Sequence, residues 1–238
     1  MNFEDWQILR FEKLSSTNDT AFEYSAKADG CYVIRADEQT AGRGRRGRVW
    51  QGLKGNLFFS LLLKFEMEKL GELVIISALS LYQSIKQISP QADVLLKWPN
   101  DVLLSGAKVS GILLEKAAGD YMIVGIGVNV EQSPQGKDML YRATSLKEAG
   151  INISGDDFLT LYLRIFSNNI NILNAEGFES LRRLWNDNAK AMGREIVVRQ
   201  EKKDVSGIFK GIDEKANLLL EKNGRTDKIT FGDVFYKE

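Results

Sequence analysis

The 238-residue sequence contains no histidine, and this absence excludes several kinds of chemistry at once. Ser/His/Asp and Cys/His catalysis need an imidazole base, and the catalytic loop of protein kinases begins with histidine. The only cysteine is Cys31, so no intramolecular disulfide can form, and we expect neither a zinc site nor haem ligation. Any catalysis must therefore use lysine, arginine, carboxylate and amide groups together with the groups of a ligand.

The chain also lacks an excess of either charge and any long apolar run. Lys plus Arg and Asp plus Glu both number 32, so no global field draws the protein to nucleic acid or to a membrane. No apolar stretch approaches the ~20 residues of a membrane helix. Residues 1–13 lack the basic start and apolar core of a signal peptide. The sequence predicts a reduced, cytoplasmic protein without a membrane partner.

Hydrophobic periodicity predicts an α+β protein, with a mixed sheet that helices cover and a small β-barrel at the C-terminus. The break at Gly193 and the short strands after it place a domain boundary near residue 190, between a domain at 1–190 and one at 191–238. The expected strands and helices are strands 31–39, 56–65 and 93–98, a short helix over 20–28 that ends at Gly30, helices 70–88, 156–173 and 176–190, and an antiparallel meander over 101–104, 108–116 and 121–130.

Residues 41–50, AGRGRRGRVW, form a glycine-rich loop with four arginines. Its Gly-x-Gly-x-x-Gly spacing matches the dinucleotide fingerprint, but that fingerprint opens a helix, whereas a strand follows this loop. A solvated basic turn is the ordinary alternative. The functional interpretation is an anion clamp, in which like-charge repulsion holds the loop open until an anion orders it.

A second group of polar residues lies in the meander. Asn100 and Asp101 follow Pro99 at a strand edge, and Lys108 begins the strand across the hairpin. Mg²⁺ prefers one or two carboxylates together with phosphate oxygens, so this edge is suited to a nucleotide and its metal. Taken singly, these residues are explained by turn chemistry and a surface charge. In the last strand, Gly125, Gly127 and Asn129 share one face and predict room for a ligand.

Taken together, these segments resemble the biotin protein ligases, strongly over residues 15–130 and more weakly to the C-terminus. The matching motifs are STN at 16–18, QTAGRGRRGRVW at 39–50, KWPND at 97–101, KVSGIL at 108–113 and GIGVNV at 125–130. The resemblance implies a class II synthetase-like catalytic domain followed by an SH3-like domain. It also implies an enzyme that uses ATP and Mg²⁺ to convert biotin to biotinyl-5′-adenylate, and then biotinylates a lysine of a biotin carboxyl carrier domain in a carboxylase.

Carried over position by position, the resemblance assigns a role to each matching residue. Arg45 would hold the acyl phosphate, Lys108 would bridge the reacting carboxylate and phosphate, and Asp101 would bind Mg²⁺ and take the proton of the acceptor lysine. The biotin-binding residues would be Ser16, Thr17, Asn18, Gln39, Gly42, Arg43, Arg45, Lys108, Gly111, Leu113 and Gly125. The nucleotide-binding residues would be Arg45, Arg46, Trp50, Asn100, Lys108 and Asn129.

Two departures from the family pattern carry further expectations. Only 14 residues precede Ser15, too few for a winged helix, so we expect the short form of the family without sequence-specific DNA binding. The loop 131–143 has no close counterpart, which leaves its adenine contacts open. A monomer and a homodimer are both compatible with the sequence.

Three other functions compete with biotin ligation. A lipoate or octanoate ligase shares the fold and the adenylate chemistry, but its R-R-x-x-G-G-G motif is absent. A nucleic-acid-binding module would grip phosphates with the arginine loop and the small barrel. A dinucleotide oxidoreductase is the most distant of the three.

Overall fold

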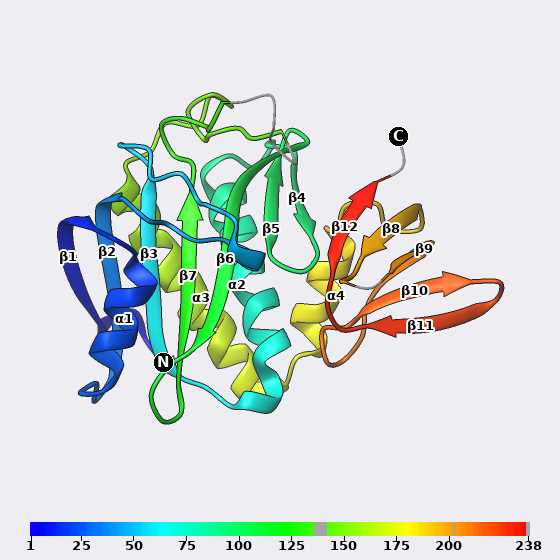
Figure 1. The fold of residues 1–238 in the computed structure, drawn as a ribbon, viewed down its shortest axis with the longest axis horizontal. Coiled ribbons are helices and arrows are strands. Elements are labelled where there is room, and N and C mark those ends of the chain that lie inside the picture. The colour runs from blue at the N-terminus through cyan, green and yellow to red at the C-terminus, as the bar shows by residue number, and fades with distance from the viewer. Residues whose placement is uncertain (136–141, 202, 237–238) are drawn as a thin grey trace.

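The computed structural model describes residues 1–135, 142–201 and 203–236, and its larger part is a seven-stranded mixed sheet (Figure 1). The strand order is β1-β2-β3-β7-β6-β5-β4. β1 runs parallel to β2, and every other pair in this sheet is antiparallel. The strands are β1 (Trp6–Leu14), β2 (Cys31–Gln39), β3 (Leu57–Lys64), β4 (Val94–Lys97), β5 (Asp101–Leu104), β6 (Ala107–Lys116) and β7 (Tyr121–Val128).

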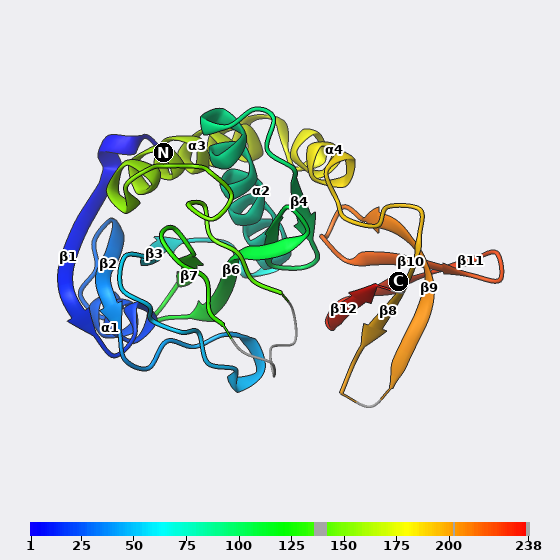
Figure 2. The same cartoon turned by 90° about the horizontal axis from the view of Figure 1, so that it is seen from above.

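Helices cover both faces of this sheet because its central strands are apolar on both sides. Alternate residues of one strand belong to different cores: Val33 and Leu61 pack in the larger core, whereas Ile34 and Leu62 pack in the smaller one. α1 (Thr17–Ser25) covers the smaller core, and α2 (Leu70–Ile88) and α3 (Gly155–Glu176) cover the larger one on the opposite face (Figure 2).

The ends of α3 show the local signals that define a helix. The Ser154 side chain accepts a hydrogen bond from the Asp157 amide at 3.0 Å, which satisfies one of the free donors of the first turn. Gly177, at φ 81, ends the helix in a conformation that an L side chain rarely adopts. Short 3₁₀ turns lie at Phe3–Asp5, Arg45–Gly47 and Met67–Lys69.

The C-terminal part is a five-stranded antiparallel sheet, and α4 (Glu179–Asp187) leads into it (Figure 1). Its strand order is β11-β10-β9-β8-β12, and Figure 1 shows the edge strand β12 on the side that faces the large sheet. Trp185 of α4 packs edge-on against Phe209, and the Trp98 indole donates a hydrogen bond to the Ala216 carbonyl at 3.0 Å. The strands are β8 (Glu195–Arg199), β9 (Asp204–Ile212), β10 (Leu218–Lys222), β11 (Arg225–Ile229) and β12 (Asp233–Tyr236).

The predicted elements are confirmed to within a few residues, and α1 begins and ends three residues earlier than expected. The sequence analysis missed β1, which pairs in parallel with β2 at the sheet edge. Only Trp6 of its nine residues is buried, so the strand lacks the apolar alternation that identifies a half-buried strand. No helix among the described residues has the length and hydrophobicity needed to span a bilayer.

Candidate active site

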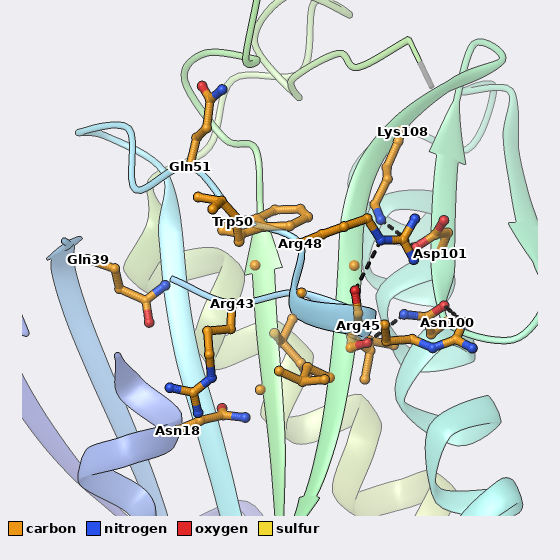
Figure 3. Close-up of a pocket in the computed structure, with 18 of the residues that line it drawn as sticks. Asn18, Gln39, Arg43, Arg45, Arg48, Trp50, Gln51, Asn100, Asp101 and Lys108 are labelled. Atoms are coloured by element: carbon orange, nitrogen blue, oxygen red, sulfur yellow. Dashed lines mark hydrogen bonds and ion pairs between the residues drawn. The ribbon is translucent and has the colours of Figure 1, made fainter. Parts of the chain in front are cut away.

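A cavity of about 380 Å³ lies between the arginine loop and the strands β6 and β7. Its lining comes from α1, β2, the arginine loop, β5, β6 and β7. Figure 3 shows Asn18, Gln39 and Arg43 on one side of the cavity, and Arg45, Asn100, Asp101 and Lys108 on the other. The cavity therefore has two polar ends that are chemically different, one rich in amides and hydroxyls and one rich in charge.

The first end is a network of hydroxyl and amide groups. Both the backbone N–H and the hydroxyl of Thr17 donate to Gln39 Oε1, at 2.8 and 3.1 Å. The Ser60 hydroxyl lies 2.6 Å from Asn18 Oδ1 and 2.8 Å from Thr17 Oγ1. Asn18 Nδ2 donates to Glu115 Oε2 at 2.6 Å. Such a network fixes the direction of each donor and acceptor, as recognition of a small polar head group requires.

Ser60 and Glu115 support this end, although the sequence analysis singled out neither. Ser60 is fully buried in the apolar strand β3. A serine in the middle of the run LFFSLLLK is the available sequence signal, because a buried hydroxyl needs a hydrogen-bond partner.

The glycines of β6 and β7 allow other side chains to approach the sheet closely. A Cβ at Gly125 would lie 2.1 Å from Asn18 Oδ1, and one at Gly127 would lie 2.3 Å from the Trp50 indole. A Cβ at Gly111 would meet both Lys108 and Trp50 at about 3.0 Å. The expected bare channel is therefore covered by Asn18 and Trp50, and the ligand space lies beside these side chains.

Protein carboxylates lie close to the arginines of the loop. Arg43 donates to Asp19 at 2.7 and 2.8 Å and lies 3.2 Å from Glu115. Arg46 and Arg48 each lie 3.1 Å from Asp233 of β12. The loop lies folded along the cavity, and these carboxylates offset part of the repulsion among its arginines. Opening of the loop in the absence of an anion stays a prediction.

At the second end of the cavity, Asp101 lies between two lysines. Lys108 Nζ is 2.5 Å from Asp101 Oδ1, and Lys97 Nζ is 4.0 Å from Asp101 Oδ2. Asn100 accepts a hydrogen bond from Arg45 at 3.0 Å and donates one to the Ile112 carbonyl at 2.6 Å. The sequence expectation that Lys108 reaches across the hairpin is confirmed for Asp101. A register irregularity in the β5–β6 pairing lies beside Lys108, where bulges commonly re-aim side chains.

Burial alters the proton affinity of two cations at this end. Burial lowers the pKa of Arg45, while the Asp233 and Asp101 carboxylates oppose that shift. Burial lowers the pKa of Lys97 to about 7, against the opposing attraction of Asp101. Lys97 is 3% exposed and is not among the lining residues, so it lies beneath the cavity floor. Burial thus opposes the positive charge at this end, and the Asp101 and Asp233 carboxylates act to retain it.

The donor set is compatible with a nucleotide-bound Mg²⁺ rather than with a metal cage built by the protein. The part of the chain that the structure describes holds no group of three metal-ligating side chains. Asp101 is a single carboxylate at the cationic end, and Mg²⁺ is commonly bound by one carboxylate with phosphate oxygens. Asp101 would have to exchange Lys108 for the metal.

The structure brings most of the predicted site residues to this one cavity. Gly42 and Arg46 do not line it: Gly42 packs against Gln39 and the Trp50 carbonyl, and Arg46 faces the C-terminal domain. Part of the loop 131–143 lies outside the described residues, but Pro134 and Ala143 line the cavity. The predicted residues that line it are Ser16, Thr17, Asn18, Gln39, Arg43, Arg45, Trp50, Asn100, Asp101, Lys108, Gly111, Leu113, Gly125 and Asn129.

Comparison with known proteins agrees with this geometry. Residues 10–129 match the model of the biotin/lipoate A/B protein ligase family, and residues 191–237 match that of the biotin protein ligase C terminal domain. A biotin–[acetyl-CoA-carboxylase] ligase from Paracoccus denitrificans is 34% identical over 94% of this chain and 98% of that protein. The chain belongs to the biotin protein ligases.

Two further proteins similar to this biotin protein ligase differ in how much of their length the match covers. The bifunctional ligase/repressor BirA of Bacillus subtilis is 35% identical, over 95% of this chain and 73% of that protein. The biotin protein ligase of Aquifex aeolicus, solved in complex with biotin and ATP, is 30% identical with a TM-score of 0.85. That match covers 96% of this chain and 97% of the Aquifex chain, and so includes both domains.

Proposed function

We propose that this protein activates biotin with ATP as biotinyl-5′-adenylate and transfers the biotinyl group to a lysine of a biotin carboxyl carrier domain. The observation that carries this proposal is the convergence of Arg45 and Lys108 on one end of a cavity whose other end is a hydrogen-bonding network of amide and hydroxyl groups. The amide and hydroxyl end suits the ureido group of biotin, and the cationic end suits the carboxylate and phosphates that must meet.

In the first step, a carboxylate oxygen of biotin attacks the α-phosphorus of ATP, and the bond to the β-phosphate breaks to release pyrophosphate. Both reactants are anions, so no general base is needed, and cations and positioning supply most of the catalysis. Lys108 and Arg45 are placed to bind the reacting oxygens, and Trp50 covers the nucleotide. Magnesium, held by the phosphates and Asp101, would neutralise charge on the leaving group.

In the second step, the amine of the acceptor lysine attacks the carbonyl carbon of the mixed anhydride, and AMP leaves. The attacking amine must lose a proton, and Asp101 is the proposed acceptor because it is the carboxylate beside Lys108 at the cationic end. The folded arginine loop would exclude water, which otherwise hydrolyses the anhydride.

The proposal is tested by incubating the protein with ATP, Mg²⁺ and either biotin or lipoate. Pyrophosphate release is followed together with mass spectrometry of the acyl-adenylate. The expected product is an adenylate that forms only with biotin. An adenylate that forms only with lipoate would mean that lipoate, not biotin, is the substrate. If neither adenylate forms, the ligase proposal fails, and binding of single-stranded nucleic acid with a steep salt dependence would favour the nucleic-acid alternative.

Lys108→Ala supplies a prediction for the same assay. Removing a cation that binds the reacting oxygens should lower adenylate synthesis by about 10²-fold or more, the scale expected for one electrostatic contact in a transition state. Circular dichroism should show an unchanged fold, because Lys108 is only half-buried. Pyrophosphate release at the wild-type rate would contradict the role of Lys108.

A further inference from the structure

A cluster of charges joins the arginine loop to the C-terminal domain through one carboxylate. Asp233 begins β12, and its side chain is only 11% exposed. It accepts hydrogen bonds from Arg46 Nη1 and Arg48 Nη2, both at 3.1 Å. Arg45 lies farther from it, at 3.6 Å, and directs its hydrogen bonds to Asn100 and the Gly232 carbonyl.

The three arginines therefore have different surroundings. Arg46 does not line the cavity, whereas Arg45 and Arg48 do. Arg45 has the longest of the three contacts with Asp233, so it exchanges this contact for a substrate anion more readily than Arg46 exchanges its own. One carboxylate also offsets only one of three positive charges, which leaves a net positive charge along the cavity.

The backbone of the loop supplies a second, independent observation. Arg46 has φ 56, in the left-handed region that non-glycine residues rarely adopt. Such a conformation persists where surrounding contacts hold it. In this loop, the contacts that hold Arg46 are with Asp233 and with the carbonyl of Arg199, both in the C-terminal domain.

We propose that Asp233 is a positioning residue that fastens the arginine loop to the C-terminal domain, with Arg46 and Arg48 as its anchors and Arg45 available to the substrate. The anchoring is a property of the protein alone. Its catalytic consequence, retention of the acyl-adenylate beneath the loop, rests on the proposed function. The C-terminal domain thereby holds the loop that borders the cavity, although its own residues do not line the cavity.

Limited trypsin digestion tests the anchoring directly, because the loop arginines are themselves cleavage sites. Asp233→Asn keeps the shape of the side chain but removes its charge, and we expect cleavage within residues 43–48 to become roughly tenfold faster. Asp233→Glu should remain close to wild type. Asp227→Asn is the matched control, since Asp227 is an exposed aspartate of the same domain on β11.

Two results would overturn the anchoring. One is loop cleavage at the wild-type rate in Asp233→Asn. The other is an equal acceleration at the loop and at Lys203 and Lys222, because Asp233 would then support the C-terminal domain as a whole. If Asp233→Asn fails to fold, Arg46→Gln removes the anchor from the loop side instead. Cleavage at the remaining loop arginines at the wild-type rate would then contradict the proposed anchoring.

Enzyme assays of the same variants then test the catalytic consequence. Asp233→Asn should raise the share of biotinyl-adenylate released into solution and raise KM for ATP more than it lowers kcat, and Asp233→Glu should restore both. Faster loop cleavage in Asp233→Asn, with no adenylate formed even by the wild type, would leave the anchor standing and refute the ligase proposal. Adenylate retained as in wild type, despite faster cleavage, would show that the anchor has no catalytic consequence.

Discussion

At the scale of single residues, the site works by balancing arginine and lysine against a few carboxylates. Arg43 is paired with Asp19 and Glu115, and Asp101 lies between Lys97 and Lys108. None of these cations needs to change protonation for a carboxylate to attack a phosphate. The site can therefore operate without histidine, provided that each cation exchanges its carboxylate partner for the substrate.

Arg45→Gly should let the activated intermediate escape. The change removes a guanidinium that hydrogen-bonds Asn100 and Gly232, and bonds to charged groups contribute about 1.5–3 kcal/mol, or roughly 10- to 100-fold in retention. Released adenylate should then label lysines of bystander proteins such as serum albumin, measured by streptavidin blotting.

Arg45→Lys is the graded control for this prediction. It keeps the charge but loses the planar fork, so its leakage should fall between wild type and the glycine variant. If Arg45→Gly retains its intermediate and labels only the carrier domain, Arg45 has no part in closing the site.

Lys97 should make stability depend on pH. Its folded pKa of about 7 lies below the ordinary value of 10.5. Between these values the unfolded chain binds one proton more than the folded chain, so stability rises with pH through this window. Relative to that of Lys97→Met, the free energy of unfolding of the wild type should rise by up to about 1.4 kcal/mol per pH unit between pH 7 and 10.

Urea denaturation at several pH values measures this difference. Lys116→Met is the control for the loss of a lysine, since Lys116 is exposed on β6. A Lys97→Met difference that varies with pH no more than the control difference would show that Lys97 keeps its ordinary proton affinity in the folded protein.

The residue types at the site were predictable from the sequence, but their partners were not. GRGRRG and KWPND indicated an anion site because several cations and glycines stand close together in the chain. Asp233, which contacts Arg46, lies 187 residues away and has no local signal. Only the fold brings the two together.

At the scale of elements, β7 determines what can lie against the sheet. Its glycines at 125 and 127 admit Asn18 and Trp50, and the strand was predicted because its remaining residues are continuously apolar. The prediction of free space on its glycine face was less accurate, since the sequence does not reveal which distant side chain fills the space. β1 escaped prediction for the related reason that an exposed edge strand carries little periodic signal.

Gly127→Ala should displace Trp50 and weaken nucleotide binding. The added Cβ would lie 2.3 Å from the indole, and overpacking of this kind costs about 1–3 kcal/mol, so KM for ATP should rise by roughly 10-fold or more. KM for biotin should change less, because the amide end of the cavity is untouched. Steady-state kinetics with each substrate varied in turn measures both.

Gly155→Ala is the matched control for this substitution. A Cβ there would lie 3.7 Å from Leu57, an ordinary contact at the start of α3. Its kinetics should equal those of the wild type. Equal effects of the two substitutions, or none from Gly127→Ala, would mean that the indole is not held over Gly127 during catalysis.

At the scale of the whole molecule, the two sheets share one hydrophobic core. Trp185 and Phe209 belong to the same buried cluster as Leu61 and Val124 of the large sheet. The sequence suggested a boundary near residue 190 from a change in strand length and spacing. Such a change cannot reveal whether the apolar faces on its two sides pack against each other, because this depends on how α4 turns.

The shared core predicts a single unfolding transition for both parts. Phe209→Ala in the C-terminal domain should destabilise the whole protein by about 3–5 kcal/mol, the usual cost of deleting a buried phenyl ring. Calorimetry should show one endotherm that shifts to a lower temperature as a unit. A separate, early transition for the C-terminal domain, with the main one unmoved, would contradict a common core.

Cys31 opens β2, and Gln39 at the other end of that strand lines the cavity. Eight strand steps of about 3.3 Å separate the two positions by roughly 26 Å. The thiol is half-buried, and burial raises its pKa, so alkylation at mildly alkaline pH is the appropriate chemistry. One dye could thus be attached without any engineered cysteine, and a second dye on one engineered cysteine in the arginine loop would form a donor–acceptor pair with it. A single doubly labelled molecule could then report in real time how often the loop opens during a catalytic cycle.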